Sequence, residues 1–205
     1  IGALSFIYDR QGDTHAAIAL LEKTILLQPT NPELYEFLGG HQYRAKQFQA
    51  AVKSFDKALE LNPRSHRAHY GLGLAQIALD PDNAPEAEKE FKQALQTEPG
   101  NADAIYQLGT LAAKNGQLAE AITYLEKAVR LQPNLAEAHS ELGKIYQQQK
   151  RFQSAENAFR TAIRYDPELA QAYFGLASLL QSMGQKDSSK PYLVEFNRLQ
   201  ETKRK

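Results

Sequence analysis

The sequence predicts an all-α fold, an α-solenoid of antiparallel helix pairs, and three observations support this prediction. A proline returns at spacings of 34, 36, 34 and 34 residues, at Pro29, Pro63, Pro99, Pro133 and Pro167. Leucines and small residues recur in step with it. The apolar positions between the prolines follow a helical rather than a strand-like period. A fixed period of roughly 20–50 residues indicates a stack of repeats, and such stacks act through an extended surface.

The first helix of each unit is marked by a recurring leucine with a small residue directly after it. The leucines are Leu4, Leu38, Leu72, Leu108, Leu142 and Leu176. The small residues are Ser5, Gly39, Gly73, Gly109, Gly143 and Ala177. In the fifth unit Ala138, Leu142, Ile145 and Tyr146 fall on one face at i, i+4, i+7 and i+8, which predicts an amphipathic helix.

The second helix of each unit carries a small residue, a large apolar residue and another small residue at fixed spacing. In the fifth unit these are Ala155, Phe159 and Ala162. We expect the small residues of the two helices to face each other, because a bulky side chain between them would overpack at a cost of about 1–3 kcal/mol. Each helix is expected to have roughly 12–14 residues. The turns between the helices hold Gly12, Lys46, Gly116, Lys150 and Gly184.

The returning proline is expected to end each second helix, because it cannot continue a helix and steers the residue before it to an extended conformation. Asn31, Ser65 and Asn101 follow three of the prolines by two residues. Side chains of this kind accept hydrogen bonds from free N–H groups in the first turn of a helix. We therefore predict them as N-caps of the next first helices.

These recurring positions resemble the tetratricopeptide repeat family, a helix–turn–helix repeat with Leu-Gly, Tyr, Ala, Phe, Ala and Pro in that order. The fifth unit carries all of them as Leu142, Gly143, Tyr146, Ala155, Phe159, Ala162 and Pro167, with His139 in the slot of the family's aromatic residue. The resemblance implies one domain over 1–205 of about six repeats, arranged as a right-handed superhelix whose first helices line the concave face. The repeats are 1–31 (incomplete), 32–65, 66–101, 102–135, 136–169 and 170–203 (a degenerate cap).

Two repeats depart from the pattern. The third has two extra residues between Leu79 and Pro85, where an acidic cluster reads as a turn rather than as a calcium loop, which needs a downstream Gly and Glu. In the sixth, Pro191 is expected to interrupt the start of the second helix, and Phe196 replaces the usual Ala. We interpret 185–200 as a C-terminal cap, because terminal repeats are atypical. The basic end 203–205 is interpreted as a frayed terminus.

The bulk composition excludes several classes of function. The chain has 24 Lys and Arg against 24 Asp and Glu, and this balance argues against binding to nucleic acid or to an anionic membrane. It has no Cys, which excludes disulfides and Cys-ligated metals. No apolar run approaches the ~20 residues of a membrane span. The regular repeats resemble bacterial members, which favours a soluble protein of the bacterial cytoplasm or periplasm. Ile1 lies part-way through a repeat, so upstream sequence is expected.

No motif points to catalysis, so the chain is predicted to be non-enzymatic, without cofactor or metal. His69 and His139 occupy the slot of an aromatic packing residue, and we interpret them as flat side chains that fill a gap between helices. His66 and His69 could share a metal, but a lone His-x-x-His pair is a poor signal. The Gly71-Leu72-Gly73 run lies inside a predicted helix, not after a strand, so it is no dinucleotide-binding loop.

The resemblance also locates a candidate binding surface, since the family binds ligands at fixed places on the first helices. Tyr70, Tyr106 and Phe174 stand where the lysine of a carboxylate clamp would stand, and Leu74 and Thr110 replace its asparagines, so capture of a chaperone C-terminal tail is not expected. The predicted partner-binding residues are Phe37, Tyr43, Arg44, Arg67, Tyr70, Leu74, Tyr106, Gln107, Lys114, Glu141, Lys144 and Phe174.

The aromatic members of this set have two interpretations, which the sequence leaves open. They receive a helix or an extended segment of a partner, or they pack against the next repeat and are mostly buried. We predict an interaction scaffold that holds a protein or peptide. The alternatives are the regulatory or targeting arm of a larger enzyme or assembly, an RNA-binding repeat, and self-association through exposed terminal repeats around Leu4, Ile7 and Tyr8.

Overall fold

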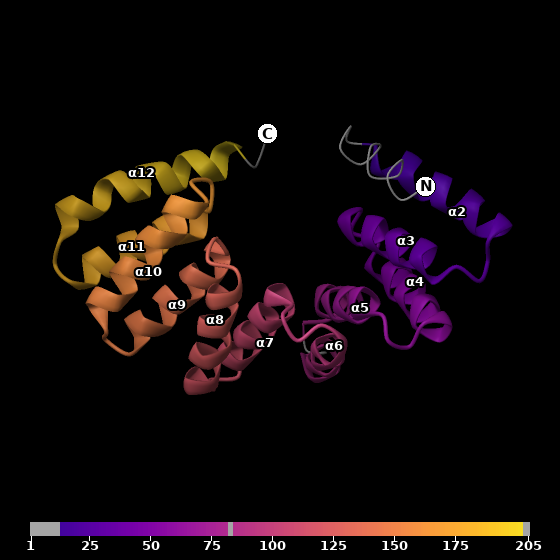
Figure 1. Ribbon diagram of the computed structural model, residues 1–205. Coiled ribbons are helices and arrows are strands. Elements are labelled where there is room, and N and C mark those ends of the chain that lie inside the picture. The colour runs from indigo at the N-terminus through magenta and orange to yellow at the C-terminus, as the bar shows by residue number, and fades with distance from the viewer. Residues whose placement is uncertain (1–12, 82–83, 203–205) are drawn as a thin grey trace. The chain divides into compact units, whose positions relative to one another are not determined.

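The computed structural model describes residues 13–81 and 84–202, and in these two ranges it contains eleven α-helices and no strand (Figure 1). The predicted all-α solenoid of helix pairs is thereby confirmed. The helices are α2 (Thr14–Leu27), α3 (Pro32–Arg44), α4 (Phe48–Leu61), α5 (His66–Leu79), α6 (Ala84–Thr97), α7 (Ala102–Lys114), α8 (Leu118–Leu131), α9 (Ala136–Gln148), α10 (Phe152–Tyr165), α11 (Ala170–Ser182) and α12 (Lys186–Thr202).

The chain divides into two compact units, Ile1–Ala104 and Ile105–Lys205, and each is described by itself. In the first unit α3 packs on α4 and α5 packs on α6. In the second unit α9 packs on α10 and α11 on α12. Second helices also contact the first helix of the following repeat, as α4 contacts α5 and α10 contacts α11. Each repeat therefore buries its apolar faces against its neighbour as well as within itself.

A single phenylalanine joins successive repeats in each unit. Phe55 of α4 is 4% exposed and lies against two glycines, Gly39 of its own repeat and Gly71 of the next. A Cβ added at Gly39 would lie 2.9 Å from Phe55 Cε1. Phe159 of α10 does the same with Gly143 and Gly175. The paired helices approach closely, but the expectation that their small residues face each other is wrong, because Gly39 and Gly143 face the phenylalanine of the second helix. A second glycine, Gly71 or Gly175, extends the same contact to the next repeat.

The turns inside the repeats use the left-handed region of backbone conformation at the positions that the sequence singles out. Gly116 and Gly184 have φ of 77° and 78°. Lys46 and Lys150 have φ of 59° at the equivalent places. This conformation is less stable for L-residues, because their Cβ crowds the backbone, and glycine has no Cβ. Gly12, the fifth turn residue, lies outside the described residues.

The N-caps are where the sequence predicts them. Asn31 Oδ1 accepts from the backbone N–H of Glu33 at 3.1 Å, and Ser65 Oγ accepts from that of Ala68 at 3.1 Å. Asn101 Oδ1 accepts from the N–H of Ala104 at 2.9 Å. These bonds satisfy N–H groups that the first turn of a helix leaves free.

The returning proline has a further role, because its carbonyl accepts a hydrogen bond from the aromatic slot six residues later. The Tyr35 hydroxyl donates to the carbonyl of Pro29 at 3.0 Å. His139 Nε2 lies 2.8 Å from the carbonyl of Pro133, and the His139 ring stacks on Tyr165 with centroids 5.7 Å apart. His139 thus packs on an aromatic ring, and its hydrogen bond also joins the proline loop to the next helix.

One expectation about the departures from the repeat pattern is wrong, namely the interruption of the last helix at Pro191. Pro191 does not interrupt the last helix, since α12 continues through it from Lys186 to Thr202. The helix begins five residues earlier, and the lost backbone bond falls near its first turn, where the cost is lower than in a helix interior. In the third repeat α6 begins at Ala84 with Pro85 in its first turn, as predicted. Asp82, Asn83, Leu4, Ile7, Tyr8 and the end 203–205 lie outside the described residues.

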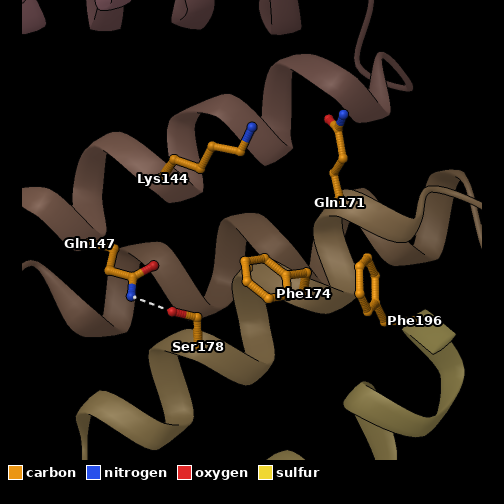
Figure 2. Close-up of a pocket in the computed structure, with 7 residues that line it drawn as sticks. Lys144, Gln147, Gln171, Phe174, Ser178 and Phe196 are labelled. Carbon is orange, nitrogen blue, oxygen red and sulfur yellow. Dashed lines mark hydrogen bonds between the residues drawn. The ribbon is translucent and has the colours of Figure 1, made fainter. Parts of the chain in front are cut away.

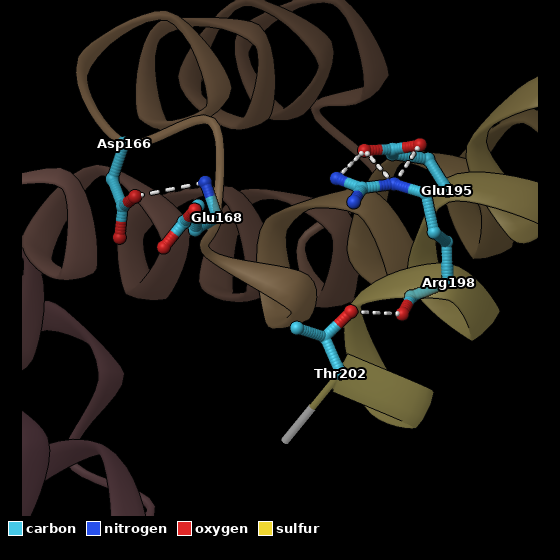
Figure 3. A network of polar contacts seen from close by, with 5 residues as sticks. All are labelled: Asp166, Glu168, Glu195, Arg198 and Thr202. Carbon is cyan, nitrogen blue, oxygen red and sulfur yellow. Dashed lines mark hydrogen bonds and ion pairs between the residues drawn. The ribbon is translucent and has the colours of Figure 1, made fainter. Parts of the chain in front are cut away.

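The end of α12 is held by a fork-shaped ion pair (Figure 3). Arg198 Nε lies 3.0 Å from both carboxylate oxygens of Glu195, and its Nη2 lies 2.5 Å from Oε1. Hydrogen bonding to Arg198 holds the pKa of Glu195 below its usual value. Thr202 Oγ1 donates to the carbonyl of Arg198 at 3.0 Å in the last turn. Since this network lies on the surface, it contributes little to the free energy of unfolding.

Candidate functional site

The predicted binding residues of the first unit surround a hollow of 240 Å³ on α3 and α5. Five of them line it: Tyr43, Arg44, Arg67, Tyr70 and Leu74. Glu36, Gly40, Phe55 and Gly71 complete the lining. A Cβ added at Gly40 would meet open space, whereas one added at Gly71 would overlap Phe55. Gly40 could therefore carry a side chain without a clash, and Gly71 could not.

The tyrosines of this hollow are half-buried, and each has an aromatic neighbour on a second helix. The Tyr70 ring lies 5.8 Å from that of Phe91, and the Tyr43 ring lies 5.6 Å from that of Phe48. Neither tyrosine is fully covered. Each ring thus packs on the second helix of its own repeat, not on the next repeat as the packing interpretation expects, while both tyrosines also line the hollow. Binding of a partner by these residues stays a prediction.

Arg44 is held in place by its own helix. Its Nη2 lies 2.9 Å from His41 Nδ1, and His41 is almost fully buried. The guanidinium is exposed at the edge of the hollow. Its position is thus fixed by a buried partner before any ligand binds, which lowers the entropy lost on binding.

The second unit carries a larger hollow of 420 Å³ over α7, α9 and α11. The predicted residues Tyr106, Gln107, Lys114, Glu141 and Lys144 line it. Lys144 Nζ lies 2.6 Å from Glu141 Oε1, so these two charges neutralise each other inside the lining. The remaining lining residues are Thr110, Ala113, Ile145, Gln148 and Gln171.

The second unit carries another hollow of 460 Å³, nearer its C-terminal end (Figure 2). It shares Lys144 and Gln171 with the 420 Å³ hollow. Its lining includes Phe174 and Phe196, whose rings pack on each other with centroids 5.2 Å apart at an interplanar angle of 44°. Phe174 is 53% exposed, the largest exposure of a described phenylalanine. This is an open aromatic surface inside a concave pocket, which is typical of protein-binding sites.

One predicted residue lies apart from these hollows. Phe37 packs against the buried cluster of Ile18, Leu21, Leu34 and Leu38 and lines none of the three hollows. It is half-buried, so its aromatic ring contributes to the stacking of the first two repeats. This cluster belongs to the preceding repeat and to its own helix, so Phe37 does not pack on the next repeat as the packing alternative expects.

Five residues that line the 460 Å³ hollow are outside the predicted partner-binding set: Gln147, Gln171, Gly175, Ser178 and Phe196. Gln171 stands five residues before Leu176, as Arg67 stands before Leu72, so the same register could have found it. Phe196 stands where other repeats bury an alanine, such as Ala58 and Ala162. A phenylalanine is too large for that gap, and its ring lies in the hollow instead.

The histidines of α5 face separate carboxylates. His66 Nδ1 lies 2.5 Å from Glu98 Oε2, and His69 Nδ1 lies 2.6 Å from Glu90 Oε2. His69 Nε2 also lies 3.0 Å from the carbonyl of Pro63. Within 13–81 and 84–202, no three His, Cys, Asp or Glu side chains gather as metal ligands would. No helix in these ranges has the length and apolar character that crossing a membrane requires.

Family models match most of the chain. Models described as tetratricopeptide repeat match residues 101–168 and residues 2–31 with 170–202, and one described as TPR repeat matches residues 40–80. Among curated proteins, the chain is 26% identical over 124 residues to anaphase-promoting complex subunit 3 of Schizosaccharomyces pombe, covering 60% of this chain and 18% of that protein. The chain spans less than a fifth of the length of the curated relatives it matches.

Two solved structures resemble the fold along nearly the whole chain. PilW, described as a widely conserved type IV pilus biogenesis factor, has a TM-score of 0.81 at 23% identity and covers 96% of this chain and 90% of its own. YrrB, described as a TPR protein with an unusual peptide-binding site, has a TM-score of 0.64 at 25% identity and covers 88% of this chain and 92% of its own.

Proposed function

Because this chain belongs to the tetratricopeptide repeat family, we propose that it is a non-catalytic interaction scaffold that binds a partner protein or peptide on its first helices. The observation that carries the proposal is the arrangement of the hollows. Eleven of the twelve binding residues predicted from the repeat register line one of them, all except Phe37. The rings of Tyr43, Tyr70 and Phe174 each pack on a ring of a second helix and also line a hollow, which suits a preformed protein-binding surface.

The nature of the partner follows from the same lining. Tyrosine and phenylalanine supply apolar area, and the charges present include the neutralised pair of Lys144 and Glu141. The other charges in the lining have both signs, with Arg44 and Arg67 beside Glu36 in the first unit and Lys114 in the second. Because the pattern of a carboxylate clamp is missing and the charge of the chain is balanced, a protein or peptide is favoured over a chaperone C-terminal tail or a nucleic acid. YrrB, whose description names a peptide-binding site, supports a peptide or protein ligand. A self-association partner would use the outer faces of terminal repeats rather than these hollows.

A second candidate is the regulatory or targeting arm of a larger protein or assembly. It is favoured by one observation: the chain spans 18% of its relative of the anaphase-promoting complex and 14% of a co-chaperone with a J domain. Both roles use the same binding surface, so the arm differs from the free scaffold only in what it is joined to. The regular repeats favour a bacterial cytoplasmic or periplasmic setting for either.

The proposal is tested by affinity capture with the full-length protein in cells of its source organism. We expect the double replacement Tyr70→Ala and Tyr106→Ala to abolish capture of the partner. It removes one aromatic ring from the 240 Å³ hollow and one from the 420 Å³ hollow. Since these rings also pack on the scaffold, the exposed groove residue Lys114 gives a second variant, Lys114→Glu, matched by Lys127→Glu on the exposed face of α8. Thermal unfolding followed by circular dichroism checks that each variant folds.

The expected result is loss of the partner from the groove variants and retention by Lys127→Glu. If all folded variants capture the same proteins in the same amounts, the hollows do not bind the partner and the proposal is wrong.

A further inference from the structure

The third repeat carries a hollow that the proposed binding surface does not use. It has a volume of 400 Å³ and is lined by Pro63, Arg64, His69, Gln93, Gln96 and Thr97. These residues come from the loop between α4 and α5, the start of α5 and the C-terminal part of α6. None of them lines the three hollows of the candidate site, so a ligand bound here leaves the proposed binding surface free.

The imidazole of His69 is part of this lining and is held at both ring nitrogens. Nδ1 lies 2.6 Å from Glu90 Oε2 on α6, and Nε2 lies 3.0 Å from the carbonyl of Pro63. The side chain keeps 13% of its surface exposed. The ring is therefore fixed before any ligand arrives, which lowers the entropy lost when a ligand stacks on it.

The fifth repeat shows what packs on a histidine in the same slot. His139 Nε2 lies 2.8 Å from the carbonyl of Pro133, which repeats the proline contact of the third repeat. The Tyr165 ring stacks on His139 with centroids 5.7 Å apart and an interplanar angle of 28°. The Arg164 guanidinium lies 5.1 Å from the centre of the Tyr165 ring. A tyrosine ring thus contacts both an imidazole and a guanidinium.

One residue of the third repeat leaves the corresponding place open. Two positions before the returning proline, the other repeats carry a large side chain: Leu27, Leu61, Leu131 and Tyr165. The third repeat has Thr97 at this position, and Thr97 is exposed and lines the hollow. A threonine has no ring to stack on an imidazole. The hollow beside His69 therefore lies at the register position where the fifth repeat has a tyrosine ring.

The other side chains of the lining suit a ring that carries a hydroxyl group. Within 13–81 and 84–202, the Arg64 guanidinium forms no hydrogen bond or ion pair with another side chain, and a guanidinium binds favourably to an aromatic face. Gln93, Gln96 and Thr97 can each donate to a phenol oxygen or accept from its hydroxyl. An aliphatic side chain would take water from these polar groups without replacing its hydrogen bonds.

The hollow suits a ring that remains attached to a polypeptide. Arg64, Gln96 and Thr97 are exposed, so the hollow opens directly to solvent. A ring bound there has a free path for the chain to which it is joined. In the fifth repeat the ring likewise enters as a side chain.

We propose that the hollow beside His69 binds a tyrosine side chain of a partner protein. Its ring stacks on His69 next to Arg64, and its hydroxyl pairs with the polar side chains at the end of α6. The partner thereby completes in the third repeat the packing that Tyr165 provides in the fifth.

The experiment uses the purified full chain with isotope-labelled histidine and follows the ring signals of His69 and His139 by NMR. The probes are N-acetyl-tyrosine amide and the matching phenylalanine and leucine amides. We expect the tyrosine probe to shift the His69 signals upfield with a Kd on the order of 1–10 mM, as befits one side chain. His139 serves as an internal control and stays unchanged, because Tyr165 already covers it.

The phenylalanine probe is expected to bind about threefold to tenfold more weakly, because it lacks the hydroxyl. The leucine probe is expected to leave the His69 signals unchanged. No response of His69 to the tyrosine probe, or equal responses to all three probes, would overturn the proposal.

Replacements at the register position test the origin of the hollow. Thr97→Tyr is expected to fill it, to shift the His69 signals upfield without a probe and to weaken binding of the tyrosine probe at least about tenfold. Thr97→Ser, the matched control, keeps the hollow open and the affinity unchanged. Arg64→Ala is expected to weaken binding roughly threefold. Circular dichroism checks that each variant folds. Undiminished binding by folded Thr97→Tyr would contradict the proposed site.

Two further comparisons identify the source of the ring and separate this site from the groove. p-Cresol has the same ring and hydroxyl without a peptide backbone, and binding of p-cresol without binding of the tyrosine probe would overturn the assignment to a polypeptide. The groove variants Tyr106→Ala and Lys114→Glu are expected to bind the tyrosine probe normally, since neither residue lines this hollow. If they lose the cellular partner while His69 never responds to the probe, the scaffold function stands and the tyrosine site is wrong.

Discussion

At the scale of single residues, the fold depends on glycines that make room for a neighbouring ring. Phe55 is confined between Gly39 on one side and Gly71 on the other, so its ring cannot move aside when either glycine gains a side chain. Gly40 is next to Gly39 in the same helix, but nothing lies within 4 Å of a Cβ added there. Two adjacent glycines therefore have opposite consequences for stability.

The replacement Gly39→Ala is expected to lower the free energy of unfolding by about 1–3 kcal/mol, because the new methyl group overpacks Phe55. Gly40→Ala is expected to raise it by about 0.5–1 kcal/mol, because alanine is the better helix former and has open space. Urea unfolding of both variants measures the difference. Equal effects of the two replacements would show that Phe55 is not confined.

The second residue-scale prediction concerns Asp56, a carboxylate beside other carboxylates. Burial, and then the charges of Glu90 and Glu60, raise its pKa above the usual value. Ionised Asp56 therefore costs stability at neutral pH, and that cost disappears as the pH falls through its raised pKa toward the unfolded value. Asp56→Asn is expected to stabilise the protein at pH 7 by at most about 0.5 kcal/mol, given solvent screening, and to lose this advantage near pH 3–4.

The measurement is the midpoint of urea unfolding of both proteins across pH 3.5 to 7. A stabilisation by Asp56→Asn that stays constant over this whole range would contradict the electrostatic explanation and point to a gain in hydrogen bonding instead.

At the scale of elements, the turns between paired helices show how far one sequence predicts structure. The register places Lys46 and Lys150 where other repeats have glycine, and the structure gives both a positive φ. Lys46→Gly is expected to stabilise the protein by up to about 1 kcal/mol, because glycine adopts this conformation without crowding. Gly116→Ala is the matched reverse change and is expected to destabilise it by about 1 kcal/mol.

Thermal unfolding of the two variants tests this pair of predictions. The two replacements are expected to shift the unfolding midpoint in opposite directions. If Lys46→Gly destabilises the protein as much as Gly116→Ala does, the lysine side chain makes a contact that outweighs its backbone conformation.

The helices themselves, their caps and their close packing could be predicted because each depends on local spacing. Asn31 and Ser65 indicate helix starts by their residue type alone, and the small residue after each leucine indicates close packing of the helices. The continuation of α12 through Pro191 could not be predicted, because it depends on where the helix begins. The second contact of Phe55, with Gly71, was missed because it joins different repeats, and a pattern within one repeat does not contain it.

For the candidate site, the register indicates which positions of the first helices face outward, and Tyr70, Tyr106 and Lys144 line the hollows of their units. Their role in binding a partner stays a prediction. Phe37 was included because the register does not report which ring packs on a buried cluster. Phe196 was missed because it lies on a second helix, where the family pattern expects a buried alanine.

At the scale of the whole molecule, the stack has no single core, so each repeat depends on its neighbours. In the second unit Leu176, Leu179 and Leu180 of α11 are fully or nearly fully buried, and Tyr192 of α12 packs against this cluster. Deleting α12 is expected to expose these leucines and to lower the thermal midpoint of the second unit strongly, with aggregation. Differential scanning calorimetry of the shortened chain checks this. An unchanged thermogram would mean that α12 does not act as a cap.

We propose that partners bind on the first helices and not on the outer faces, and site-specific photo-crosslinking in cells distinguishes these two locations. A photoreactive phenylalanine analogue replaces Tyr106 in the groove or, in a matched variant, Leu131 on the exposed face of α8. We expect a defined crosslinked partner from position 106 and none from position 131. A partner that crosslinks from position 131 and not from position 106 would contradict the claim.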